Sequence, residues 1–335
     1  MKRWIVKAIV FLSVLFVLAA CGDKSADDVK KDLNEKMEKS TGYKATAEMM
    51  LNTGEKPQKY DVEIWHSKPD YYRVELKNAK KDQSQMILRN NEGVFVLTPA
   101  LNKSFKFQSG WPQNSSQAYL YESLIKDIKG DDEAKFQVAK DGYIFTTKTN
   151  YQHQSVLPNQ KIILDKKELT PKKVEIMDTD NEPVITVDFK KVEMNVKFDK
   201  DAFDTKRNMT AKKSDVPTMT SEEEPFSVKY PSYTPEGTEQ EEEKTVKTMD
   251  GKRVVLTYGG EKSFTVIQEQ ATVAEASTTT PVNGDVVDLG FSIGALSKQS
   301  IQWTADGVEY IIASDDLSPE EFMMIASSME KEQGK

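Results

Sequence analysis

Cysteine and histidine are nearly absent from this chain. Its 335 residues contain one cysteine, Cys21, and two histidines, His66 and His153. A single cysteine excludes a disulfide within the chain. The two histidines lie far apart, and neither belongs to a pattern of cysteine and histidine that is typical of a zinc site. We therefore interpret both as solvated or hydrogen-bonded side chains and expect no metal site.

Motifs of catalytic and phosphate-binding sites are also missing. The chain has no G-x-S-x-G nucleophile elbow and no phosphate-binding loop. Carboxylate pairs of the glycosidase kind carry no information in a chain with 54 Asp and Glu residues. The formal net charge of −8 argues against nucleic acid as a partner and against electrostatic docking on anionic lipid. We expect no catalytic residue, no cofactor and no enzyme activity.

One long apolar run is present, at the very start of the chain. Three basic residues lie in positions 2–7, and the following uncharged segment, 8–20, is shorter than the roughly 20 residues of a membrane-spanning helix. This pattern is typical of a secretory signal. Leu18-Ala19-Ala20-Cys21 resembles the lipobox of bacterial lipoproteins, which implies a diacylglycerol on the Cys21 sulfur and cleavage before it. An ordinary signal peptide with a chance cysteine is the alternative.

The body of the chain changes from helical to strand periodicity near residue 43. Val29, Leu33 and Met37 recur every four residues and predict a helix over 28–39. Alternation of apolar and polar residues then predicts a series of antiparallel strands with one wet face, interrupted by a helix over 114–130. In the strand at 59–67, Trp65 falls on the same face as the charged residues. We expect a single curved antiparallel sheet with helices packed against it.

A polar segment without periodicity follows, and the chain then begins a second set of elements. Glycine-containing turns at 259–260 and 306–307 predict hairpins, and Ser318, Pro319 and Glu321 predict the start of a last helix. The acidic segment 236–244 is interpreted as a solvated turn. The expected organisation is a lipoprotein signal peptide at 1–20, a tether at 21–27, a sheet domain at 28–205, a linker at 206–225 and a smaller α+β domain at 226–335.

The inner face of such a sheet has two interpretations. If the sheet curls without closing, its inner face can line an apolar cavity for a lipid or an acyl chain. The helices at 28–39 and 115–129 can instead fill that space completely. The sequence leaves these two alternatives open.

Short motifs in the first half of the chain resemble the LolA-like family of outer-membrane-lipoprotein carriers. The family patterns W-x-K-R-P-x-x-F and D-G-x-x-L-W-x-Y-x-P are matched in part by Trp65, Lys68, Pro69 and Tyr72 and by Gly93, Phe95 and Pro99. Over residues 26–205 the resemblance implies an unclosed eleven-stranded half-barrel, with helices as a lid, around a cavity that takes acyl chains. It places ligand-binding residues inside the half-barrel, at Trp65, Lys68, Tyr72 and Phe95. Lys68 stands where the family has a functional arginine.

The order of segments, from the lipobox to the last helix, resembles the YdcC-type sporulation lipoproteins of Bacillus relatives. This resemblance implies a non-enzymatic factor in sporulation, the spore envelope or germination, held by its lipid on the extracytoplasmic face of the cell membrane. The implied partners are a cell-wall enzyme or a membrane regulator, or an acyl-chain ligand. Two alternatives remain: a lipid or lipoprotein carrier, and an envelope-stress sensor that regulates an anti-sigma factor.

The lipobox gives a direct prediction. We expect the mature protein to begin at Cys21 with a diacylglycerol on its sulfur, and Cys21→Ala to remove this lipid. Mass spectrometry of the amino-terminal peptide from both proteins measures this. An unmodified Cys21, or cleavage at another position, contradicts the assignment.

Overall fold

The structure is a computed structural model. It describes residues 24–52, 57–79, 84–108, 110–111, 117–151, 154–211, 227–248, 251–274 and 278–329. The expected signal peptide, Cys21, His153 and the larger part of the expected linker lie outside these residues. No helix within the described ranges is long and apolar enough to cross a membrane.

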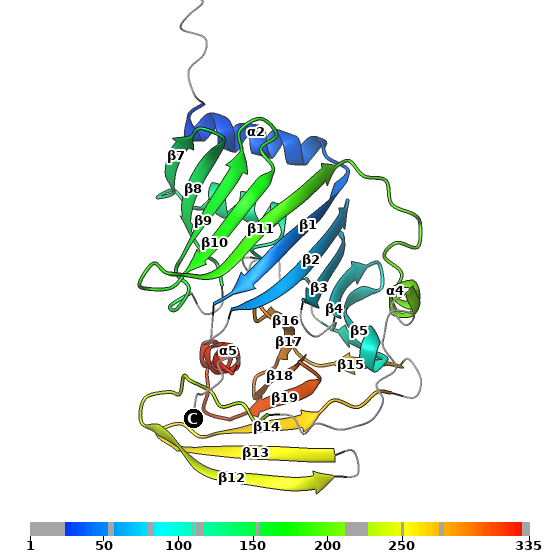
Figure 1. Ribbon diagram of the computed structural model, residues 1–335, viewed down its shortest axis with the longest axis vertical. Coiled ribbons are helices and arrows are strands. Elements are labelled where there is room, and N and C mark those ends of the chain that lie inside the picture. Colours follow the sequence, from blue (N-terminus) through cyan, green and yellow to red (C-terminus); the bar gives the residue numbers. More distant parts are fainter. Residues whose placement is uncertain are drawn as a thin grey trace, which may run out of the picture.

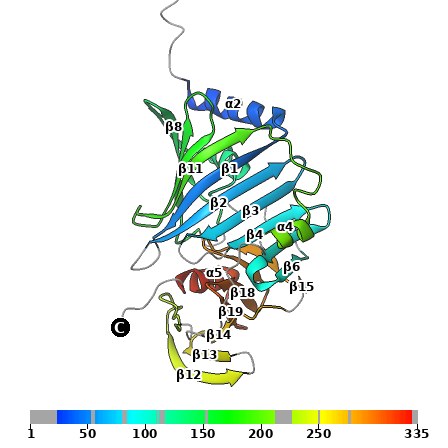
Figure 2. The ribbon, with the colours of Figure 1, turned by 45° about the vertical axis from the view of Figure 1, so that its right-hand side comes forward.

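Twelve strands form one large curved sheet (Figures 1 and 2). Eleven of them come from the first part of the chain and pair with one another only in antiparallel fashion. They are β1 (Gly42–Leu51), β2 (Gln58–Ser67), β3 (Tyr71–Asn78), β4 (Ser84–Asn90), β5 (Gly93–Thr98), β6 (Lys103–Phe107), β7 (Lys135–Ala139), β8 (Gly142–Lys148), β9 (Asn159–Asp165), β10 (Pro171–Met177) and β11 (Pro183–Met194). The sheet runs β15-β6-β5-β4-β3-β2-β1-β11-β10-β9-β8-β7, and its two end strands do not pair with each other. The expected unclosed antiparallel half-barrel of eleven strands is confirmed.

The twelfth strand comes from the last third of the chain. β15 (Thr278–Val282) lies beside β6 and forms the one parallel pair among the described strands. The rest of this part builds a second sheet, at the end of the molecule remote from α2 in Figure 1. Its strands, in spatial order, are β12 (Thr238–Thr248), β13 (Gly251–Gly260), β14 (Phe264–Gln270), β19 (Val308–Ala313), β18 (Ser300–Ala305), β17 (Ile293–Leu296) and β16 (Asp285–Asp288). The division into domains at 28–205 and 226–335 stays a prediction.

Local signals explain where two of the helices begin. The four described α-helices are α2 (Ala26–Lys39), α3 (Tyr121–Gly130), α4 (Thr205–Ala211) and α5 (Pro319–Ser328), and Pro99–Leu101 forms a short 3₁₀ turn, η2. Ser318 caps α5 as predicted: its hydroxyl accepts from the Glu321 amide at 3.3 Å, while the Glu321 carboxylate accepts from the Ser318 amide. Ser25 and Asp28 form the same capping box on α2.

Two elements differ from the sequence expectation. The helix expected at 114–130 begins only at Tyr121, and Leu120 precedes it without a side-chain cap. Residues 118–121 are all buried, so tertiary packing rather than a polar cap fixes this start. The acidic segment 236–244 is not simply a turn, because residues from Thr238 onward form β12. β13 supplies its backbone hydrogen bonds, so strong alternation in the side chains is not required.

The two faces of the large sheet carry separate apolar clusters. On the inner face, residues such as Ala45, Ile64 and Val74 join a cluster that includes α2, α3 and the second sheet. On the outer face, residues such as Leu88 and Phe95 join a smaller cluster with the chain at 202–209. Alternate side chains of a strand point to opposite faces, so each strand that is buried on both sides contributes to both clusters.

Gly42 fixes the start of β1 by its lack of a side chain. Its φ of +153° lies in a region that side chains rarely adopt, and a Cβ at this position would stand 2.2 Å from the His66 carbonyl oxygen. β1 therefore approaches β2 directly at the end where α2 passes into the sheet.

Candidate functional site

Helices fill one part of the inner face. Val29 and Leu33 of α2 are fully buried there, as are Leu124 and Ile128 of α3. This confirms helices packed against the sheet, as the alternation predicted. It also means that this part of the half-barrel holds its own side chains.

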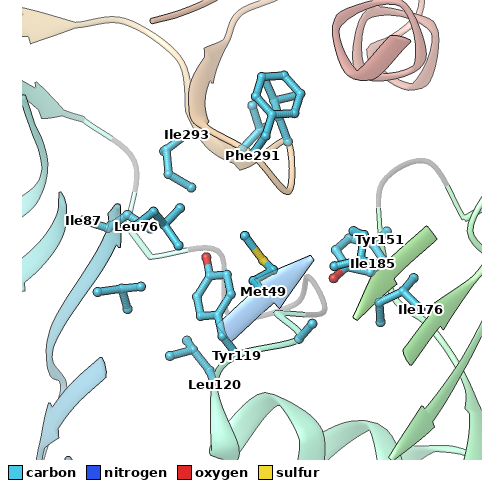
Figure 3. Close-up of a cluster of buried hydrophobic side chains, with 14 of the residues drawn as sticks. Met49, Leu76, Ile87, Tyr119, Leu120, Tyr151, Ile176, Ile185, Phe291 and Ile293 are labelled. Atoms are coloured by element: carbon cyan, nitrogen blue, oxygen red, sulfur yellow. The ribbon is translucent and has the colours of Figure 1, made fainter. Parts of the chain in front are cut away.

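The second sheet fills another part of the inner face. The chain between β16 and β17 forms a turn over residues 288–293, here named the inserted turn. Leu289, Phe291 and Ile293 are each at most 6% exposed. Figure 3 shows Phe291 and Ile293 entering above Met49, with Leu76 and Ile87 to one side and Tyr151 and Ile185 to the other.

Gly290 lets the inserted turn approach the sheet closely. Its φ is +84°, and a Cβ would lie 3.3 Å from the Ile185 Cδ1 atom and 3.8 Å from the Leu51 Cδ2 atom. The tip of the turn therefore packs between side chains of β1 and β11. Two internal hydrogen bonds hold its shape, from the Leu289 amide to the Ser292 carbonyl at 2.9 Å and from the Gly290 amide to Asp288 Oδ1 at 2.8 Å.

Two polar side chains from the first part of the chain bind the inserted turn. The Tyr119 hydroxyl donates to Asp288 Oδ2 at 2.6 Å. Gln85 Oε1 accepts from the Ile293 amide at 2.8 Å and from the Ser292 hydroxyl at 3.1 Å. These contacts join parts of the chain more than 160 residues apart. Tyr119 thus binds a carboxylate and Gln85 binds a backbone N–H, and both groups occur in peptides.

The burial of Asp288 destabilises the folded protein at neutral pH. The carboxyl group is buried, and burial raises its pKa above the ordinary value, although the bonds from Tyr119 and Gly290 act in the opposite direction. A buried charge is expensive unless it is fully paired. The contact between Tyr119 and Asp288 is therefore specific, but the burial of the carboxyl group makes it weaker than the apolar packing around it suggests.

Three clefts lie on the described part of the chain. A cleft of about 90 Å³ lies between the inner side of β5 and β6 and the strands β17, β18 and β19. Small-molecule sites typically measure roughly 300–1,000 Å³. Two clefts of about 480 Å³ each lie between α2 and α3 and at the β4–β5 turn, and most of the residues that line them are polar or charged.

Two of the four expected ligand-binding residues lie outside the half-barrel. Trp65 and Phe95 belong to the outer cluster, so they point away from the interior in which the resemblance placed them. Trp65 stacks on Phe198 at 5.4 Å between ring centroids and meets Phe203 edge-on at 6.5 Å. These rings fasten the segment before α4 to the outer face. A ligand-binding role for the four residues stays a prediction.

A buried arginine completes the outer cluster. Arg73 donates to Glu63 Oε2 at 2.6 Å, to Glu75 Oε2 at 2.9 Å and to Asn208 Oδ1 of α4 at 2.9 Å. Its guanidinium lies 4.3 Å from the centroid of the Trp65 ring. Through Asn208 this network binds α4 to the sheet by polar as well as apolar contacts.

Tyr72 does point inward, into a stack of rings that the sequence did not reveal. It stacks on His66 at 4.6 Å and on Trp111 at 4.9 Å. His66 is 3% exposed, and its Nδ1 lies 2.6 Å from Glu122 Oε1 at the start of α3. The Tyr43 hydroxyl donates to the other oxygen of Glu122 at 2.9 Å. Burial, followed by the Glu122 charge, raises the pKa of Tyr43 well above its ordinary value.

Lys68 has a structural contact. Its Nζ donates to the carbonyl oxygens of Met37 at 2.7 Å and Glu38 at 2.8 Å. These carbonyls belong to the last turn of α2, where a positive charge is favourable. Lys68 therefore joins the β2–β3 turn to the helix that covers the inner face. Within the described ranges, no three His, Cys, Asp or Glu side chains gather as a metal site requires.

Comparison with known proteins identifies the family. Residues 1–203 match the family described as sporulation protein YdcC-like. The chain belongs to this family. It is 50% identical to sporulation protein YdcC of Bacillus subtilis (strain 168) over 324 residues, which cover 97% of this chain and 96% of the relative.

Solved structures give weaker similarities. The MucA/MucB complex of Pseudomonas aeruginosa has a TM-score of 0.33 and 13% identity, with 90% of this chain and 98% of that chain covered. A domain of a Vibrio parahaemolyticus protein, described as a putative outer membrane lipoprotein-sorting protein, has a TM-score of 0.32 and 14% identity, with 55% and 99% covered. Scores this low carry no argument, so the fold rests on the strand order described above.

The contacts of Lys68 predict a stability effect. We expect Lys68→Ala to lower the free energy of unfolding by about 0.5 kcal/mol, because α2 loses a cation at its last turn. Lys39→Ala is the control, since it removes a cation and an exposed ion pair with Glu35 from the same helix end but no hydrogen bond to the α2 carbonyls, and we expect it to lose less stability. Urea unfolding measures both. Equal stability of wild type and Lys68→Ala contradicts the structural role.

The burial of Asp288 predicts a pH dependence. Above the ordinary Asp pKa of about 3.9, the unfolded chain releases a proton that the folded chain retains, so stability falls as pH rises. Asp288→Asn removes this penalty and keeps an oxygen for the Gly290 amide. We expect it to unfold at higher urea concentration than wild type at neutral pH, with the gap closing as pH falls toward 4.

The control for this prediction is Asp285→Asn, at an exposed position of the same strand. It should follow wild type at every pH. A destabilised Asp288→Asn protein, with a gap that does not change with pH, contradicts the assignment.

Proposed function

We propose that this protein is a non-enzymatic sporulation factor that is anchored by a lipid on Cys21 and binds a protein partner at the extracytoplasmic face of the cell membrane. The lipobox and the net negative charge support a lipid anchor rather than electrostatic docking. Membership of the sporulation protein YdcC-like family supports the process. The missing catalytic motifs support binding rather than chemistry.

The filled inner face is the observation that favours a protein partner over an acyl chain. The side chains of Phe291 and Ile293 occupy space that a bound acyl chain needs. α2 and α3 occupy the neighbouring part. Carriage of lipid therefore requires the inserted turn to leave first, whereas a partner can bind the outer surfaces as they stand.

The second sheet offers one such surface. β12 is the last strand in its sheet and pairs on one side only, with β13, among the described strands. Its backbone groups on the other side can accept a further strand. Most of its side chains are exposed and many are charged, which limits pairing to a partner strand of complementary charge. We therefore place the partner on residues 226–335.

Two measurements on the full mature protein test this proposal. A photo-crosslinking residue at Val246 of β12 should capture one protein in sporulating cells, at a ratio close to one to one. The matched control is Val138 of β7, an exposed valine on the end strand of the other sheet, with 39% exposure against 38%. A fluorescent fatty acid should show no saturable binding to the purified protein.

The opposite results contradict the proposal. Saturable binding of the fatty acid, without a specific cross-link from Val246, makes the protein a lipid carrier. Turnover of peptidoglycan or lipid by the purified protein alone makes it an enzyme.

A further inference from the structure

The inserted turn has the features of a bound peptide. It presents Leu289, Phe291 and Ile293 to the inner face and keeps its own shape by internal hydrogen bonds. It contacts the first part of the chain through a few apolar side chains and through hydrogen bonds to two side chains, Tyr119 and Gln85. A few apolar side chains and two polar contacts are on the scale of a bound peptide, although the turn belongs to the same buried cluster as the rest of the inner face.

We propose that the inner face around Tyr119 and Gln85 is a peptide-binding site that the inserted turn occupies in cis, and that a partner segment of the same chemistry replaces it. This inference rests on the proposed function, because it names the chemistry of the partner. The segment has an acidic residue followed by apolar residues on both sides of a glycine. In this chain the sequence is Asp288-Leu289-Gly290-Phe291.

The polar contacts explain why the occupant is a peptide. Gln85 Oε1 takes a backbone N–H, and the Tyr119 hydroxyl donates to a carboxylate. An acyl chain offers no N–H group along its length. Leu51 and Ile185 lie so close to the tip of the turn that they fit a glycine there. An acyl chain has no such tip, so this feature is specific to a peptide turn. The site therefore distinguishes a peptide turn from lipid.

Other contacts between the last third of the chain and the first part can keep the two parts joined when the turn leaves. β15 pairs with β6 over five residues. An ion pair joins Lys103 to Glu309, and the Ser155 hydroxyl donates to Glu320. These contacts lie outside the inserted turn. The buried carboxyl group of Asp288, whose pKa is raised, lowers the strength of the cis contact itself.

The test uses the full mature chain with a fluorescein-labelled peptide of residues 287–294. Phe291→Ser weakens the cis occupant, so this variant should bind the peptide roughly tenfold more tightly than wild type, whose site is largely filled. Tyr258→Ser is the matched control, because it removes a buried aromatic ring from the same sheet at a distance from the turn. It should behave as wild type. Fluorescence anisotropy gives the dissociation constants.

A control peptide with serine at the Phe291 position should bind none of the three proteins. Equal binding of the first peptide to all three proteins, or no binding to a folded Phe291→Ser protein, overturns the inference. Saturable binding of a fluorescent fatty acid to Phe291→Ser in place of the peptide also overturns it. None of these results depends on the Val246 cross-link, so failure of the inference and failure of the proposed function are distinguishable.

Hydrogen exchange on the wild-type protein provides a second measurement if Phe291→Ser does not fold. The Ile293 amide, which bonds to Gln85, should exchange roughly tenfold faster than the slowest amides of β1, because it opens locally. Exchange of Ile293 only together with those amides shows that the turn leaves only on global unfolding. That result overturns the inference.

Discussion

The inner face of the twelve-stranded sheet must be shielded from water, and this requirement determines the arrangement of the molecule. An antiparallel sheet can leave one face wet, but here both faces carry apolar side chains. α2 and α3 cover one part of the inner face, and the inserted turn covers another. The second sheet is therefore placed by the apolar surface that the first sheet leaves open. Gly290 packs against Ile185 at the point where the second sheet covers this surface most closely.

The outer face follows a different rule, because charge pairing is as important there as apolar contact. Arg73 lies between two carboxylates, an amide and the ring of Trp65. A buried guanidinium is tolerated only when such partners surround it. The segment at 198–209 supplies the cover and one of the partners, Asn208. The chain thus covers this part of the outer face before it passes into the second sheet.

Local signals made parts of this structure predictable from the sequence, and distant contacts did not. The capping box at Ser318 and the turn at Asp306 and Gly307, both at positive φ, are readable in a few residues. The alternation in β2 also placed Trp65 with the charged residues, whereas the motif resemblance placed it inside. For Phe95 the sequence gives no such signal, since β5 is buried on both faces. β15 and the inserted turn depend on partners more than 150 residues away, and no local pattern encodes them.

The position of β15 has a consequence for the order of folding. Strand β6 receives its outer neighbour only after residues 278–282 have been made, although β6 itself ends at Phe107. Until then the edge of β6 and part of the inner face are exposed to other chains. Truncation anywhere before residue 278 therefore leaves the large sheet incomplete, with the edge of β6 unpaired on that side.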